Sequence, residues 1–401
     1  MPKVGLMSGL TLNVIILGGV SLLTDVSSEM VFALLPFFMT TVLGVQIAVV
    51  GLIEGAAEAT SSLLKVFSGW LSDRAGRRKP FATLGYSISA LIKPLFYFST
   101  SAIQVFTIRT LDRVGKGIRT SPRDALIADS IDPEVRGKTY GFHRSMDTLG
   151  AVLGPLMAFL LFPIIGYRDV FLASIIPGGL AVLLLLVFVR ERSKHVKTSK
   201  PFRFKVGFKS LSRSFKFFIF IVLLFSLSNF SYAFFLLRAY DLGISIPIAP
   251  LLYLLFNVSY AVFAFPIGVL ADKVGKMPLL SFGYAMFGIT CLGFALAYHS
   301  YYAVALFVAY GVSYAAFDTL QRAIVPDLVP TELRGTAFGA LHATTGLAAL
   351  PASLIAGSLW QLISPNAPFI FGASLSLISS ALILMLKSKR TNLQNCHLQD
   401  S

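Results

Sequence analysis

The sequence predicts an all-α integral membrane protein with 12 transmembrane helices, arranged as two six-helix bundles that repeat each other. The 401-residue chain is 55% hydrophobic and only 13% charged, whereas soluble domains carry about 25% charged residues. Apolar stretches of about 20 residues, the length that crosses a bilayer, follow one another along the chain. Short motifs of the first half also return in the second half.

The first six predicted spans precede a basic segment in the middle of the chain. The first span carries no small-residue cleavage site, so we interpret it as a retained helix and not as a signal peptide. The fourth span is so charged that only the internal repeat places it among the spans. The predicted spans lie near 11–36, 46–70, 80–99, 102–127, 138–162 and 167–190, then near 215–239, 247–270, 278–298, 301–325, 336–360 and 367–387.

Basic residues set the predicted domain boundaries and the orientation. The net charge is +15, and the Lys and Arg residues gather in loops that fall on one side of the membrane if both termini are cytoplasmic. This distribution follows the positive-inside pattern and does not indicate nucleic-acid binding. Cys291 and Cys396 cannot form a disulfide framework. We expect an N-terminal bundle over 1–190, a cytoplasmic linker over 191–214, a C-terminal bundle over 215–388 and a cytoplasmic tail over 389–401.

Two motifs repeat at nearly the same spacing. GWLSDRAGRRK at 69–79 returns as GVLADKVGKMP at 268–278, and DALIADSIDPEVRG at 124–137 returns as RAIVPDLVPTELRG at 322–335. Two such matches indicate a duplicated six-helix unit. Parallel repeats of this kind predict a solute site between the halves near the bilayer midplane, reached by alternating access.

These motifs resemble the signature of the major facilitator superfamily over essentially the whole chain. The resemblance implies a cytoplasmic gate in which loop residues contact acidic residues at the foot of span four. It also implies an antiporter-like motif in span five, at Gly150, Gly154 and Pro155. A narrower resemblance, over 24–38, 111–130 and 141–155, is to bacterial facilitators of which some are associated with siderophore traffic. The implied gate residues are Gly69, Asp73, Arg74, Gly76, Arg77, Asp124, Asp129, Asp272 and Asp327.

Ionisable side chains inside spans are costly and are kept mainly where they face a cavity or a partner. Asp25 and Glu29 lie one helical turn apart in span one, and Glu54 and Glu58 do so in span two. Each pair could share a proton, so we expect these four carboxylates to couple transport to protons. The second half carries Asn229 and Ala233 where the first has Asp25 and Glu29, which predicts asymmetric coupling.

Span four presents its charged residues on one helical face, and the excess of cations there favours an anionic solute. A purely structural network of ion pairs is the alternative interpretation. His143 can titrate near neutral pH, and Asp318, Gln321 and His342 are further polar candidates. The candidate substrate-binding residues are Arg109, Asp112, Arg113, Lys116, Arg144, Asp147, Asn229, Arg238, Asn257 and Arg322.

We therefore expect a proton-coupled secondary transporter of the bacterial inner membrane. Its expected substrate is a small organic anion or zwitterion, for example a hydroxycarboxylate siderophore. A broad-specificity drug/proton antiporter is the alternative within transport, and a non-transporting receptor or a membrane enzyme is the alternative outside it. The sequence contains no ATP-binding, zinc-helix or nucleophile-elbow motif. We expect no cofactor and no metal, with protons, the small-molecule substrate and the lipid bilayer as partners of a monomer.

Overall fold

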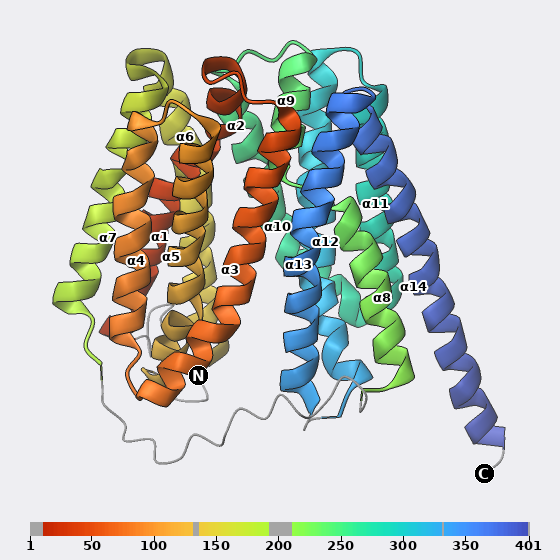
Figure 1. Ribbon diagram of the computed structural model, residues 1–401. Helices are drawn as coiled ribbons and strands as arrows, with labels where there is room; N and C mark the ends of the chain where they lie inside the picture. Colours follow the sequence, from red (N-terminus) through yellow and green to blue (C-terminus); the bar gives the residue numbers. More distant parts are fainter. Residues whose placement is uncertain (1–10, 131–135, 192–210, 331–332, 400–401) are drawn as a thin grey trace, which may run out of the picture. The chain divides into compact units, whose positions relative to one another are not determined.

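The computed structural model describes residues 11–130, 136–191, 211–330 and 333–399. Over these residues the chain is helical and contains no strand (Figure 1), which confirms the predicted all-α class. The chain divides into two compact units: residues 1–43 and 60–202 form the first, and residues 44–59 and 203–401 form the second. The predicted linker over 191–214 falls mostly outside the described residues.

The first unit is built around α1, which packs mainly against α6 and α7, while α4 packs against α5 and α7. Directly after α2 the chain forms a short π-helical segment, η1, and directly after α4 it forms a 3-10 segment, η2. The elements in chain order are α1 (Leu12–Phe32), α2 (Leu35–Phe37), η1 (Phe38–Val42), α3 (Ile47–Ala75), α4 (Lys79–Ile92), η2 (Lys93–Phe98), α5 (Ala102–Asp129), α6 (Arg136–Ala173) and α7 (Ile175–Phe188).

The helix α3 contributes to both units, because residues up to 59 belong to the second one. There its small residues allow the backbone to approach a helix of the second unit closely. A Cβ added to Gly51 would lie 2.2 Å from the carbonyl oxygen of Ser353, and one added to Gly55 would lie 2.8 Å from the Cα of Leu350. Small residues at such spacing are typical of tightly packed membrane helices.

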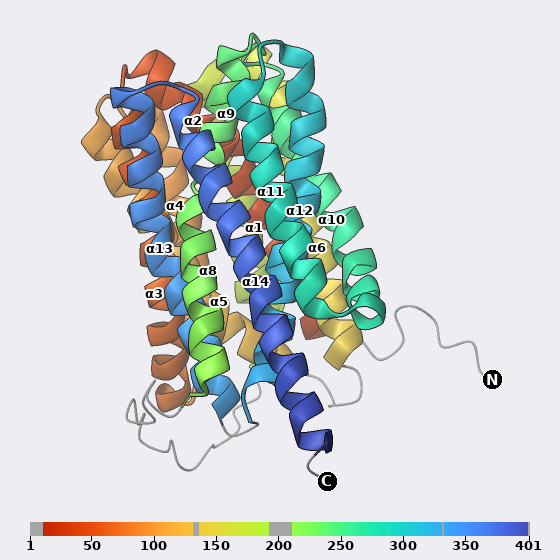
Figure 2. The same ribbon diagram turned by 90° about the vertical axis from the view of Figure 1, so that its right-hand side faces the viewer.

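In the second unit α11 packs against α12 and α14, α10 packs against α12, and α8 packs against α13 and α14. Figure 2 shows α14 running beside α8 and α11. The helix expected for the predicted seventh span is interrupted between α8 and α9. The elements are α8 (Arg213–Ser228), α9 (Tyr232–Asp241), α10 (Ala249–Val274), α11 (Lys276–Leu296), α12 (Ser300–Leu328), α13 (Arg334–Leu362) and α14 (Ala367–Gln399).

Ten stretches among the described residues are long and apolar enough to cross a membrane. The predicted fourth span, α5, is absent from these ten because of its charge. The predicted fifth and sixth spans fall within one 50-residue stretch, Thr139–Phe188, which is interrupted at Gly166 by a left-handed φ of 74°. The count of 12 spans therefore stays a prediction.

The crossing of α4 and α5 depends on two glycines that face each other. A Cβ at Gly85 would lie 2.5 Å from the carbonyl oxygen of Gly115, and a Cβ at Gly115 would lie 2.7 Å from the carbonyl oxygen of Gly85. Neither position has room for a side chain, because the obstructing atoms belong to backbone. The close approach brings the polar residues of α5 within reach of α4.

We expect Gly115→Ala to destabilise the protein by about 1–3 kcal/mol, because the added methyl group overpacks this crossing. The measurement is thermal unfolding of the purified protein in detergent. Gly19→Ala is the matched control, since nothing lies within 4 Å of a Cβ at Gly19 in α1. The control should be neutral or stabilising by up to about 1 kcal/mol. Equal effects of the two substitutions would show that the crossing is not tight.

Candidate functional site

The charged residues of α5 are buried within the first unit. The exposed fractions are 0% for Arg109, 2% for Asp112, 7% for Arg113 and 4% for Arg119. Burial of several charges on one helix is stable only if neighbouring groups compensate them. The charged face predicted for span four is thus turned toward the protein interior.

Asp112 is held by contacts from two helices. The hydroxyl group of Ser89 in α4 donates a hydrogen bond to its Oδ1, and Nη1 of Arg109 lies 3.9 Å from its Oδ2. The guanidinium of Arg109 also lies 3.6 Å from the ring centroid of Phe32 in α1, and that of Arg113 lies 5.2 Å from the same ring. Two cations thus lie close to one aromatic ring.

Sequence analysis missed Lys93, a lysine at the first position of η2 that is 0% exposed. Its Nζ donates a hydrogen bond of 2.9 Å to Oγ of Ser28 in α1. Asp112, Asp25 and Glu29 all interact electrostatically with this ammonium group. The available signal was a lysine within the apolar stretch at 80–99, followed directly by a proline.

The predicted carboxylates of α1 lie against the predicted antiporter-like glycines of α6. A Cβ at Gly150 would come within 2.8 Å of the Cβ of Asp25, and a Cβ at Gly154 would come within 2.6 Å of the Cβ of Glu29. The two glycines therefore leave the space that the two carboxylate side chains occupy. Oε2 of Glu29 is buried and has no hydrogen-bond partner in the described part of the chain.

A second polar group joins α1, α5 and α6 nearer the start of α1. The hydroxyl group of Ser21 donates a hydrogen bond to Oδ1 of Asp147, and Nη1 of Arg123 donates one of 3.2 Å to Oγ of Ser21. His143 is 4% exposed, and its Nδ1 lies 3.5 Å from Oδ1 of Asp147. Arg144, the neighbouring residue on α6, is exposed.

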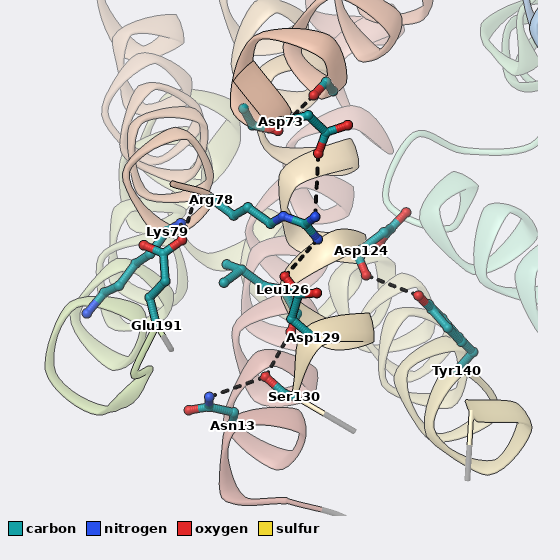
Figure 3. A network of polar contacts seen from close by, with 12 residues as sticks. Asn13, Asp73, Arg78, Lys79, Asp124, Leu126, Asp129, Ser130, Tyr140 and Glu191 are labelled. Atoms are coloured by element: carbon teal, nitrogen blue, oxygen red, sulfur yellow. Dashed lines mark hydrogen bonds and ion pairs between the residues drawn. The ribbon is translucent and has the colours of Figure 1, made fainter. Parts of the chain in front are cut away.

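Figure 3 shows the network at the predicted gate, in which Arg78 occupies the centre. Its Nη1 lies 2.9 Å from Oδ2 of Asp129, and its Nη2 lies 3.5 Å from Oδ1 of Asp73. The backbone N–H of Arg78 donates to the carboxylate of Glu191 beyond α7. Arg78, which was not among the predicted gate residues, thus contacts the acid at the end of α5. Tyr140 donates a 3.1 Å hydrogen bond to the carbonyl oxygen of Asp124.

The second unit carries an ion pair at the equivalent place. Nζ of Lys276 lies 2.8 Å from Oδ2 of Asp327. Asp327 is the counterpart of Asp129 in the repeat, and Lys276 stands in the motif copy where the first half has Arg77, the neighbour of Arg78. Gly76 and Gly275, which are equivalent in the repeated motif, both have positive φ, at 63° and 95°. Glycine is favoured there because other residues rarely adopt this conformation. The predicted gate residues Gly69, Arg74 and Asp272 lie in the same motif copies.

The remaining candidates in the second unit have separate surroundings. Asn229 lies in the break between α8 and α9, and Asn257 donates to the carbonyl oxygen of Tyr253 on its own helix. Arg238 donates hydrogen bonds of 3.0 and 3.1 Å to two carbonyl oxygens at the end of α11. Arg322 is exposed and pairs with Asp318.

The carboxylates predicted in span two belong to the part of α3 that packs with the second unit. Glu54 is 5% exposed and Glu58 is half-buried. Glu58 interacts electrostatically with Tyr314 of α12, whose ring lies 5.3 Å from that of Tyr260. The hydroxyl group of Tyr260 donates a 2.9 Å hydrogen bond to Asp318. Glu54 and Glu58 thus belong to the second unit, whereas the α1 carboxylates belong to the first.

Comparison with known proteins supplies the family context. The family model for the Major Facilitator Superfamily matches residues 17–240 and 217–395. A protein described as an uncharacterized MFS-type transporter of Methanocaldococcus jannaschii is 41% identical over 387 residues, which cover 94% of this chain and 95% of the relative.

Solved structures of transporters share the fold. A POT family transporter in complex with 5-aminolevulinic acid has a TM-score of 0.79 at 14% identity, covering 94% of this chain and 96% of that one. A bacterial homologue of the human lysosomal transporter Spinster has a TM-score of 0.75 at 16% identity, again covering 94% and 96%. At these identities the structural likeness concerns the fold alone.

The gate geometry predicts a measurable coupling between Arg78 and Asp129. In a double-mutant cycle with Arg78→Gln and Asp129→Asn, the two changes should be non-additive by about 0.5–1 kcal/mol, the range for partly exposed ion pairs. Thermal unfolding at low salt is the measurement. Arg77→Gln with Asp129→Asn is the matched control and should be additive. Additivity in both cycles would show that Arg78 and Asp129 do not stabilise each other, and would contradict the role of Arg78 in the gate.

Proposed function

Because this chain belongs to the major facilitator superfamily, whose members are membrane transporters, we propose that it carries a small organic anion or zwitterion by alternating access, driven by protons. The proposal places the protein in the cytoplasmic membrane as a monomer with both termini in the cytoplasm. A hydroxycarboxylate siderophore is one substrate of the proposed class. Membrane transport follows from the family, whereas the substrate and the coupling ion are the proposed part.

The anionic substrate class is proposed from the buried excess of positive charge on α5 and η2. Arg109, Arg113, Arg119 and Lys93 are all at least nine-tenths buried, and α5 offers Asp112 as the carboxylate among them. Intramembrane charges of this kind are retained mainly for function. A negatively charged group of a bound substrate would compensate part of this positive charge.

Arg113 is the best candidate for direct contact with the substrate. Arg109 is fully buried, close to Asp112 and stacked on Phe32. Arg113 lies farther from that ring and keeps an exposed fraction of 7%. A planar guanidinium can bind a carboxylate through two parallel hydrogen bonds, which a lysine cannot do.

Proton coupling is proposed for Asp25 and Glu29 of α1. Both are half-buried, and two glycines of α6 accommodate them. Carboxylates near each other and away from water bind protons more readily, whereas a nearby cation opposes this. Lys116 and Arg119 interact electrostatically with Asp25, so an anion that neutralises the α5 cations would change the proton affinity of this pair.

The drug/proton antiporter is the second candidate, and the aromatic interior of the second unit favours it. Tyr232 and Tyr253 stack with ring centroids 4.7 Å apart, and Tyr253 and Phe256 are nearly parallel at 5.9 Å. Aromatic faces of this kind bind apolar and cationic rings. The ligand screen described next decides between the two candidates.

We expect matched carboxylate ligands to raise the thermal unfolding temperature of the protein more than their amides do. Arg113→Lys should weaken binding by up to about 2 kcal/mol, because the charge remains and the planar fork is lost. Arg113→Gln should weaken it further. Arg74→Gln, which removes an exposed arginine from the gate end of α3, is the control and should bind as the parent does. The measurement is ligand-dependent thermal unfolding of the purified protein.

If the parent binds amides as well as acids, or prefers organic cations, the anion proposal is wrong and the drug antiporter replaces it. If Arg113→Gln unfolds because it leaves a carboxylate unpaired, then Arg113→Gln with Asp112→Asn should fold again. That rescue would assign Arg113 to the structural ion-pair network.

We expect Asp25→Asn and Glu29→Gln to abolish accumulation driven by a pH gradient while sparing solute exchange, because exchange moves no net proton. The measurement uses proteoliposomes and the carboxylate with the largest stabilisation in the screen. Asp73→Asn, at the gate, should slow both activities together and serves as the comparison. Full accumulation in the Asp25→Asn, Glu29→Gln double variant would contradict the role of this pair and would indicate Glu54 and Glu58 as the coupling residues.

A further inference from the structure

Titratable side chains line up along the interface of α1 and α6. On α6, His143, Asp147, Gly150 and Gly154 follow one another at intervals of one turn and therefore share a face. The two glycines of that face lie against Asp25 and Glu29 of α1. His143 and Asp147 continue the same face toward the start of both helices, which is the end where the gate lies. We call Glu29, Asp25, Asp147 and His143 the α1–α6 ladder.

Neighbouring groups of the ladder interact with one another. Asp25 and Asp147 interact electrostatically, and Ser21, one turn before Asp25 on α1, donates a hydrogen bond to Oδ1 of Asp147. Nδ1 of His143 lies 3.5 Å from the same oxygen. Nε2 of His143 is buried and has no hydrogen-bond partner in the described part of the chain.

The second half of the chain has no titratable side chain at any of the four equivalent positions. The spacing that relates Asp129 to Asp327, in the motif copies directly before α6 and α13, places Leu341 opposite His143 and Thr345 opposite Asp147. Asn229 and Ala233 replace the two acids of α1. In the second unit α8 also packs against α13, without a titratable group at these four positions.

We propose that Asp147 and His143 form a proton relay between the α1 carboxylates and the gate end of the first unit. This inference rests on the proposed coupling at Asp25 and Glu29 and adds the route by which their proton is exchanged. Chains of Asp, Glu and His inside membranes commonly serve as proton relays. His143 is suited to the outermost step because an imidazole ring can accept a proton at one nitrogen and release one from the other, and its Nδ1 faces Asp147.

Each step transfers one proton from a donor group to an acceptor group, so the total charge is conserved. The carboxylic acid at Asp25 or Glu29 gives its proton to the Asp147 carboxylate, directly or through the Ser21 hydroxyl group. Asp147 then gives a proton to Nδ1 of His143. The imidazolium releases one from Nε2, which is buried in this structure, to water that enters when the gate end opens. The charged groups that interact with His143 are Arg123, Asp124, Arg144 and Asp147, and those that interact with Asp25 are Asp147, Lys116, Glu29 and Arg119.

The test measures proton uptake by the full-length protein in detergent, with the proton itself as the probe. A rapid jump from about pH 8 to about pH 6 spans the titration range of imidazole, and a soluble pH dye reports the uptake. The phase that disappears in the Asp25→Asn, Glu29→Gln double variant belongs to the α1 carboxylates. We expect His143→Gln to slow this phase by at least about tenfold with an unchanged amplitude, and imidazole in the buffer to restore its rate.

His143→Leu, which introduces the residue found at the equivalent position of the second half, is the second variant in case Gln disturbs folding. His299→Gln, at an exposed histidine before α12, is the matched control and should leave the phase unchanged. An unchanged rate in both His143 variants would overturn the relay while leaving the proposed coupling intact. If the parent shows no phase that depends on Asp25 and Glu29, the coupling and the relay are both wrong.

Discussion

A helix that buries several charges must be surrounded by groups that compensate them, and α5 imposes this requirement on the first unit. Ser89 and Lys93 of the α4–η2 segment, together with Ser28 and Phe32 of α1, provide polar or aromatic contacts to this interior. The close crossing at Gly85 and Gly115 brings α4 near enough to do so. The glycines of α6 have the same effect on the other side of α1. Small residues therefore determine where charge can be buried.

The second unit solves the same packing problem mainly with aromatic rings. Phe225 stacks on Tyr284 with centroids 3.9 Å apart, and Phe235 stacks on Tyr310 at 4.3 Å. Ion pairs described there, such as Lys276 with Asp327, lie toward the end of the helices. The two halves thus share an ion pair next to the repeated motif and differ in their interiors. In the proposed mechanism the first unit provides the charged groups that bind the substrate and the protons, and the second provides an aromatic packing surface.

The sequence predicted the helical class, the repeat, the membership in the family and the buried face of α5, because each depends on periodicity or on a motif. It could not identify contacts between helices. Periodicity assigns Arg77 and Arg78 to the same loop but does not show which one reaches Asp129. Lys93 was overlooked because one lysine barely changes the hydropathy of a span, and its partner Ser28 has no charge. The alignment of Gly150 with Asp25 depends on helix packing, which no single segment encodes.

The position of α5 in the chain also bears on how the protein enters the membrane. Each charge near a helix centre costs about 3 kcal/mol on insertion scales, so α5 cannot partition into lipid alone. The groups that contact Asp112 and stack with Arg109 lie in α4 and α1, and both helices are synthesised before α5. The order of the helices along the chain thus provides a polar surface for α5 as it leaves the translocation machinery. If a rearranged gene placed α5 ahead of α1 and α4, the charges of α5 would meet lipid before these partner helices had been synthesised.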